Sequence, residues 1–129
     1  MCLEIITKEE ILSEDLTVWK IVGYNTIDRH YYFGIYFNPK RIKKGVNKTI
    51  IKNIYTYSNI KYNSGYHCYL LEKDAKDIHE NFYNYPQRKV RKFVIPKGTK
   101  VTYGKQIYNN NNNEFETETI VIVTPILIN

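Results

Sequence analysis

The chain has 129 residues, of which 43% are hydrophobic and 25% are charged, and its formal net charge is +6. This length and composition predict one globular domain over residues 1–129, able to bury a core without disulfides or a metal, and they exclude a disordered chain. No run of 18 apolar residues occurs, so no membrane partner is expected.

Cysteine usage and the first residues bear on the compartment. Cys2 and Cys68 are too few for a disulfide framework, so both are expected to be reduced thiols that pack as small hydrophobic side chains. The N-terminus lacks the basic start and continuous apolar core of a signal peptide. These features predict a protein of a reducing cytosol.

The first elements in chain order are a strand, a short helix and a second strand. Residues 2–6 are apolar and predict a strand. Thr7 followed by Glu10 matches a capping box, which predicts a short helix from Lys8 to about Glu14. Alternation of side chains then predicts a strand at Thr17–Tyr24.

The middle of the chain is aromatic and then basic. His30–Phe37 is dense in tyrosine and phenylalanine and predicts a strand, which Asn38-Pro39 interrupts. Lys40–Lys48 is lysine-rich, contains turn-forming residues and is expected to be a loop. Thr49–Tyr57 alternates sufficiently to predict another strand.

The stretch from Gly65 to Gly104 carries the clearest local signals. Tyr66–Leu71 predicts a strand entered from a turn. Helical spacing then places four apolar residues on one stripe of a helix of about three turns: Leu71, Ala75, Ile78 and Phe82. Tyr85-Pro86 is expected to end this helix, because a residue before proline is pushed out of helical geometry.

A hairpin follows the helix. Arg88–Ile95 alternates as a strand, and Thr99–Tyr103 returns as its partner. Pro96-Lys97-Gly98 suits the connecting turn, with proline expected at the second turn position and glycine at the fourth.

The C-terminal part predicts a loop and a last strand. Asn109–Asn113 is an asparagine tract and is expected to be a loop tip. Thr119–Ile128 is nearly continuous in β-branched residues and is predicted as a strand at the centre of the sheet. The whole pattern predicts an α+β fold, with a mostly antiparallel twisted sheet of six to eight strands, one main helix and one short N-terminal helix.

The chemistry-bearing residues point to binding. A net charge of +6 and 13 tyrosines favour an anionic partner that also offers a flat surface. His67 and Cys68 are adjacent and face opposite ways on a strand, so no metal site and no cofactor are expected. Basic residues alternate with aromatic residues across Tyr31–Lys61, but no nucleic-acid-binding signature is present, so nucleic acid is not the expected partner.

Several short motifs recur together in one group of proteins. They are a Met-Cys-Leu start, the segment Val18–Val22, the element Tyr31–Gly34, Gly65-Tyr66-His67 before a helix with Asp74-Ala75, and the hairpin Val94–Gly104. In these motifs the chain resembles small phage-encoded proteins similar in kind to anti-defence factors. The layout is also similar to a trimmed half of the ADP-ribosyltransferase-type fold. However, Trp19-Lys20 stands where that fold places a histidine or arginine at the end of the first strand.

The resemblance implies a viral anti-defence protein of the host cytoplasm. It predicts a homo-oligomer that binds and sequesters a nucleotide-derived immune signal without catalysis. Aromatic faces would hold the base and cationic groups the phosphates. The residues expected to bind the ligand are Trp19, Lys20, Tyr32, Tyr66, His67, Arg91 and Tyr103.

Two alternatives remain open at the level of sequence. One is a reduced ADP-ribosyltransferase or a signal-cleaving enzyme, because Glu116-Thr117-Glu118 has the Glu-x-Glu spacing of many such transferases; it would require Glu116 or Glu118 to lie near His67. The other is an inhibitor that binds a host defence protein through its tyrosine-rich strands.

Overall fold

The computed structural model describes residues 3–34, 40–56, 58–83, 86–109 and 116–129. Eleven strands and one helix are found there, all strand pairs being antiparallel. The elements are β1 (Ile5–Ile11), β2 (Leu16–Asn25), β3 (His30–Tyr32), β4 (Val46–Lys48), β5 (Asn53–Tyr55), β6 (Lys61–Asn63), β7 (Tyr66–Tyr69), α1 (Glu72–Phe82), β8 (Arg88–Ile95), β9 (Lys100–Asn109), β10 (Glu116–Thr124) and β11 (Ile126–Ile128). The predicted α+β class with a mostly antiparallel sheet is confirmed.

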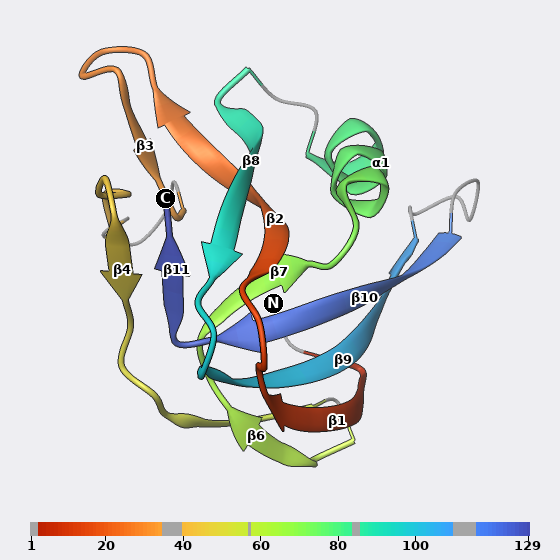
Figure 1. The fold of residues 1–129 in the computed structure, drawn as a ribbon. Helices are drawn as coiled ribbons and strands as arrows, with labels where there is room; N and C mark the ends of the chain where they lie inside the picture. The colour runs from red at the N-terminus through yellow and green to blue at the C-terminus, as the bar shows by residue number, and fades with distance from the viewer. Residues whose placement is uncertain (1–2, 35–39, 57, 84–85, 110–115) are drawn as a thin grey trace.

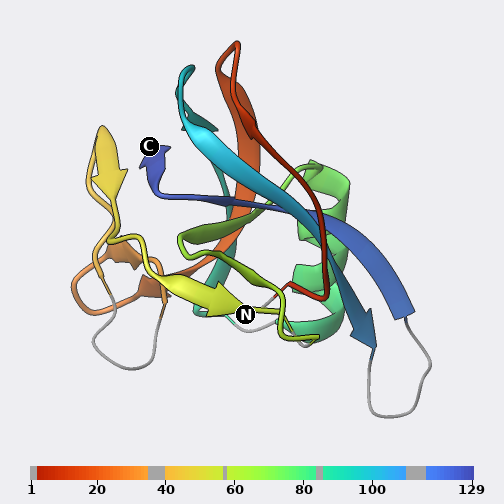
Figure 2. The same cartoon turned by 90° about the horizontal axis from the view of Figure 1, so that it is seen from below.

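Nine strands form one sheet in the order β1-β9-β10-β7-β2-β8-β11-β4, with β3 paired to β2. The sheet twists strongly, and β10 crosses the view of Figure 1 nearly at right angles to β8. β5 and β6 form a separate two-stranded sheet, which lies at the bottom in Figure 1 and toward the viewer in Figure 2. The strands outnumber the predicted six to eight because five three-residue strands carry too little pattern to be detected.

The sheet buries a cluster of side chains on each of its two faces. The helix face carries Tyr69, Val121 and Val123, and α1 covers it with Ala75 and Ile78. The second face carries a separate cluster that includes Val18, Val22, Cys68, Phe93 and Ile122. Alternation along each strand therefore sends successive residues to different clusters.

The predicted N-terminal helix is wrong, because β1 occupies that segment. Ile5–Ile11 pairs with β9, and Glu10 lies opposite Val101. A bulge lies between Ile6 and Lys8. The Thr7 and Glu10 pattern satisfies a capping box, but three isoleucines in seven residues favour a strand and the neighbouring β9 supplies its backbone partners.

The helix and the following hairpin lie close to their predicted positions. α1 ends at Phe82, three residues before Pro86, and Leu71 precedes it with an exposed side chain instead of belonging to the buried stripe. The turn after β8 runs one residue later than predicted, since Thr99 N–H donates to the carbonyl of Pro96. Gly98 therefore occupies the third turn position with φ +87°, the conformation that a type II turn requires there.

The C-terminal run is split into two strands at Pro125. β10 lies between β9 and β7, which confirms the predicted central position, whereas β11 lies between β8 and β4. Proline has no N–H to donate to a ladder, so the chain changes direction there and its two parts pair with different strands. The predicted asparagine loop tip lies almost entirely outside the described residues, as do Cys2 and most of the predicted strand end after Gly34.

Candidate ligand-binding site

Two of the predicted ligand-binding residues lie side by side on the second face. Lys20 is directly opposite Arg91 across β2 and β8. The Lys20 ammonium is enclosed and donates a hydrogen bond of 2.9 Å to the carbonyl oxygen of His67. Burial lowers the pKa of Lys20, and the nearby Cys68 thiol is fully buried with its pKa raised by burial to about 11. The Arg91 guanidinium lies over the ring of Tyr31 at 4.3 Å.

His67 is on the helix face and is held by hydrogen bonds at both ring nitrogens. Nδ1 lies 3.2 Å from the carbonyl oxygen of Gly65, which can only accept, so Nδ1 carries the proton. Nε2 then accepts from the Tyr62 hydroxyl at 3.1 Å, and that hydroxyl accepts from the Leu3 N–H at 3.0 Å. Burial, followed by the charge of Lys20, lowers the pKa of His67 to about 4. His67 is thus a neutral structural link.

The predicted aromatic residues do not share one cavity among the described parts of the chain. Trp19 packs in the helix-face cluster, and Tyr66 is buried on the second face with its ring 4.5 Å from that of Phe33. Tyr32 donates its hydroxyl hydrogen bond to Asp28 at the hairpin tip. Tyr103 donates to Glu10 at 2.6 Å near the edge strand β1. Whether any of the seven residues binds a ligand therefore remains a prediction.

The carboxylate required by the enzyme alternative lies apart from His67. Glu118 pairs in register with Ile107 and its carboxylate forms an ion pair with Lys105 at 3.0 Å. His67 is opposite Val123, five residues further along β10, so about 17 Å of strand separates the two positions and their side chains leave opposite faces. The side chain of Glu116 lies outside the described residues.

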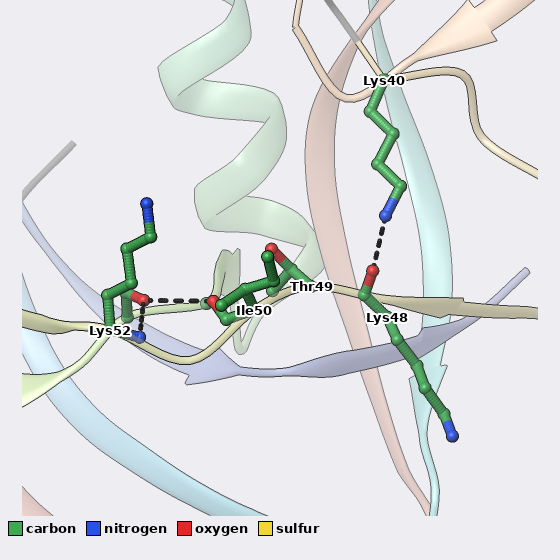
Figure 3. Close-up of a pocket in the computed structure, with 7 residues that line it drawn as sticks. Lys40, Lys48, Thr49, Ile50 and Lys52 are labelled. Atoms are coloured by element: carbon green, nitrogen blue, oxygen red, sulfur yellow. Dashed lines mark hydrogen bonds between the residues drawn. The ribbon is translucent and has the colours of Figure 1, made fainter.

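A pocket of about 590 Å³ offers a different site, on the side of the molecule away from α1 (Figure 3). We call it the lysine pocket. Its lining consists of Lys40, Lys48, Thr49, Ile50, Lys52, Ser64 and Gly65. Three of these seven residues are cationic and none is acidic, so the pocket has a positive potential suited to an anion.

The lysines of this pocket are available to a ligand. All three are exposed, and within the described ranges none of them forms an ion pair. The Lys40 ammonium donates to the carbonyl oxygen of Lys48 at 2.6 Å, which ties two walls of the pocket together. Figure 3 shows the ammonium groups of Lys48 and Lys52 extending in different directions from the same segment.

The backbone of the pocket is fixed by local hydrogen bonds and by a close crossing. Lys52 N–H donates to the Ser64 hydroxyl at 2.7 Å, and Ser64 N–H donates to the Lys52 carbonyl at 2.6 Å. Thr49 N–H donates to the carbonyl of Pro125 at 3.0 Å. At Gly65 a Cβ atom would lie 2.4 Å from the Thr124 carbonyl oxygen, so glycine is needed for this crossing of chains. The lysines are therefore carried on a defined frame.

Sequence reasoning missed this pocket because its lysines seemed to belong to a loop and to a separate strand. The only available signal was the density of lysine between Lys40 and Lys52. Their convergence with Ser64 and Gly65 depends on the contact of this segment with the start of β7, which no local pattern encodes.

Two further features of the described residues complete the picture. No group of three or more His, Cys, Asp and Glu side chains lies close enough there to hold a metal ion. No helix in the described part of the chain is long and apolar enough to cross a membrane. His79, expected to be solvated, is half-buried and its Nε2 lies 2.9 Å from the carbonyl oxygen of Arg88.

Comparisons of the chain with protein-family models, with curated protein sequences and with solved structures find no match.

Proposed function

We propose that the protein binds a phosphate-bearing, nucleotide-derived signalling molecule in the lysine pocket and holds it without chemical change. The observation that carries the proposal is the pocket of about 590 Å³ with three lysines and no carboxylate in its lining. The proposed setting is that of a viral anti-defence protein, acting as a homo-oligomer in the host cytoplasm. Sequestration in this sense requires affinity alone.

The charge arrangement supports an anionic ligand over an uncharged one. Each exposed lysine contributes little by itself, roughly 0.2–1 kcal/mol per ion pair, so several contacts must act together. Lys40, Lys48 and Lys52 can supply three such contacts to one ligand, because they line the same pocket. A ligand with several negative charges is therefore favoured.

The environment of Cys68 supports binding over covalent catalysis. A nucleophilic cysteine needs thiolate character and access to substrate. Cys68 is fully buried, and its pKa of about 11 keeps the thiol protonated at neutral pH. The enzyme alternative needs Glu118 near His67, and these residues leave opposite faces of the sheet.

A second candidate function is the binding of a host defence protein, and a specific surface favours it. Four large apolar side chains are more than half exposed near the two-stranded sheet: Ile50, Ile51, Tyr55 and Ile60. Clustered apolar exposure of this kind is typical of protein-interaction surfaces. This surface adjoins the lysine pocket through Ile50, so a ligand and a protein partner would compete there.

Native mass spectrometry of the protein, expressed in cells with active nucleotide-signalling immunity, tests the proposal. The expected result is an excess mass that is released on denaturation and that nucleotide analysis identifies as an intact phosphate-bearing molecule. A chemically altered nucleotide would favour the enzyme alternative. Protein that is free of ligand, and that captures a host protein reversibly, would favour the second candidate.

Charge-removing variants locate the binding site. The triple variant Lys40→Gln, Lys48→Gln, Lys52→Gln should lose at least ten-fold in affinity for ATP, because three ion pairs of the stated strength are removed. A matched control removes the same charge from exposed lysines outside the pocket: Lys73→Gln, Lys89→Gln, Lys97→Gln. Isothermal titration calorimetry should show the loss in the pocket variant only, and equal losses in both would contradict the assignment.

Arg91 provides a test of the residues predicted from sequence. If the predicted residues bind the ligand, Arg91→Gln should weaken ATP binding without unfolding the protein, whereas unchanged affinity would leave the lysine pocket as the better site. Arg91 is suited to this test because its described contacts, with Tyr31 and Asn129, lie at the surface of the second face.

A further inference from the structure

The lining of the lysine pocket offers charge and little else. Apart from the three lysines, the described lining side chains are a threonine, a serine and one isoleucine, together with Gly65. The Ser64 hydroxyl already accepts from Lys52 N–H at 2.7 Å and lies 3.5 Å from the Ile50 carbonyl oxygen. The lining therefore presents no aromatic ring and no side-chain amide, which are the groups that stack on a base or read its hydrogen-bonding edge.

The cationic groups are spread along the pocket. Lys48 and Lys52 are four residues apart on an extended segment, which spans up to about 14 Å. Figure 3 shows their ammonium groups directed away from one another, with Lys40 on a third side. A single phosphate group would satisfy one of these positions, whereas a chain of linked phosphates matches their spacing better.

From the lining and this spacing we infer that the lysine pocket recognises the phosphate chain of its ligand and is indifferent to the base. The ligand class is a nucleoside polyphosphate or another linear polyphosphate. This inference rests on the proposed function, since it concerns the same pocket. It goes beyond that function by stating which part of the ligand determines affinity.

The test is a series of binding measurements with defined probes at fixed ionic strength. AMP, ADP, ATP, GTP, UTP and inorganic triphosphate are titrated against the full chain by isothermal titration calorimetry. Affinity should rise roughly two- to five-fold with each added phosphate, as expected for one more exposed ion pair. ATP, GTP, UTP and inorganic triphosphate should agree within about two-fold.

Two outcomes separate the failure of the inference from the failure of the proposed function. Affinities that differ ten-fold or more between ATP, GTP and UTP, or a loss of binding with inorganic triphosphate, would overturn the inference and leave the proposed function standing. Binding of none of the phosphate compounds would overturn both.

Salt and single variants provide a second readout that does not depend on the base. Raising NaCl from 50 to 300 mM should weaken ATP more than AMP, because exposed charge pairs are screened and ATP makes more of them. Lys52→Gln should lower the affinity for ATP and inorganic triphosphate by the same factor, with Lys73→Gln as the control. A variant effect on ATP that is absent with inorganic triphosphate would show that Lys52 reads the nucleoside, against the inference.

Discussion

At the scale of single residues, the buried polar groups are organised by hydrogen bonds to the backbone. His67 joins three segments, since its ring contacts Gly65 and Tyr62 and its carbonyl oxygen accepts from Lys20. The Tyr62 hydroxyl extends the link to the backbone of Leu3. A neutral imidazole fits this arrangement because Nε2 must accept while Nδ1 donates. His67 was predicted to contact a ligand, and its described contacts are all within the protein.

The lowered pKa of His67 predicts that acid destabilises the fold. Its native pKa of about 4 lies below the ordinary value of 6.5, so the unfolded chain takes up the proton first. Stability is complete above about pH 6.5 and is lost as the pH falls toward 4, by at most about 3 kcal/mol. Urea denaturation at several pH values should show this loss in the wild type.

The matched variants for this prediction are His67→Gln and His30→Gln. His67→Gln should be less stable at pH 7, since Tyr62 and Gly65 lose their ring partner, but its additional loss between pH 6.5 and 4 should be smaller than in the wild type. His30→Gln should keep the wild-type dependence, because His30 lies on the hairpin strand β3, away from this hydrogen-bonded link. An identical acid profile in wild type and His67→Gln would contradict the assignment.

At the scale of elements, close approaches between strands explain two of the six glycines. At Gly104 a Cβ atom would lie 2.5 Å from the Ile5 carbonyl oxygen and 2.5 Å from a Leu3 methyl, so the pairing of β9 with β1 needs a residue without a side chain. Gly65 meets the Thr124 backbone in the same way where β7 begins. Backbone atoms cannot give way as a flexible side chain can.

Alanine substitutions at these glycines should therefore be costly. Gly65→Ala and Gly104→Ala should each lower the free energy of unfolding by about 1–3 kcal/mol or more, because strands must separate to admit the methyl group. Gly34→Ala is the control, since no atom lies within 4 Å of its Cβ position. Its effect should stay within about 0.5 kcal/mol. Urea denaturation measures all three, and equal effects at the three positions would contradict the prediction.

At the scale of the whole molecule, stability should fall from the centre of the large sheet toward the small one. β2 and β8 pair over eight positions and are covered on the helix face by α1. β5 and β6 pair over three positions and are joined to the rest of the fold in part through the buried Tyr62. Strands with few partners and exposed backbone open first.

Hydrogen exchange should reveal this gradient. Amides of β2 and β8 should exchange most slowly, and those of β5 and β6 should exchange by local opening that costs much less than global unfolding. Tyr62→Phe removes the hydroxyl that accepts from Leu3 and donates to His67, so it should speed exchange in β5 and β6 and leave β2 and β8 nearly unchanged. Uniform acceleration across the chain would show that the two sheets open together.

Predicting the site required more than predicting the elements. Strong local patterns identified α1, β2 and β8 to within one or two residues, because helical spacing and alternation are properties of short segments. The seven predicted site residues were chosen for chemical type and are divided between two faces, whereas the lysine pocket joins Lys40 and Lys52 to Ser64 across a contact between distant segments.

The sequence by itself determined the class of the fold, the single helix after Leu71, the central position of the C-terminal strand and the excess of positive charge. Those features follow from composition, periodicity and β-branched content. Only the tertiary structure decided that Ile5–Ile11 is a strand, that the chain divides at Pro125 and that three lysines surround one pocket. The physical reason is that backbone pairing and the crossing at Gly65 depend on partners far away in the chain, which outweigh or add to each local preference.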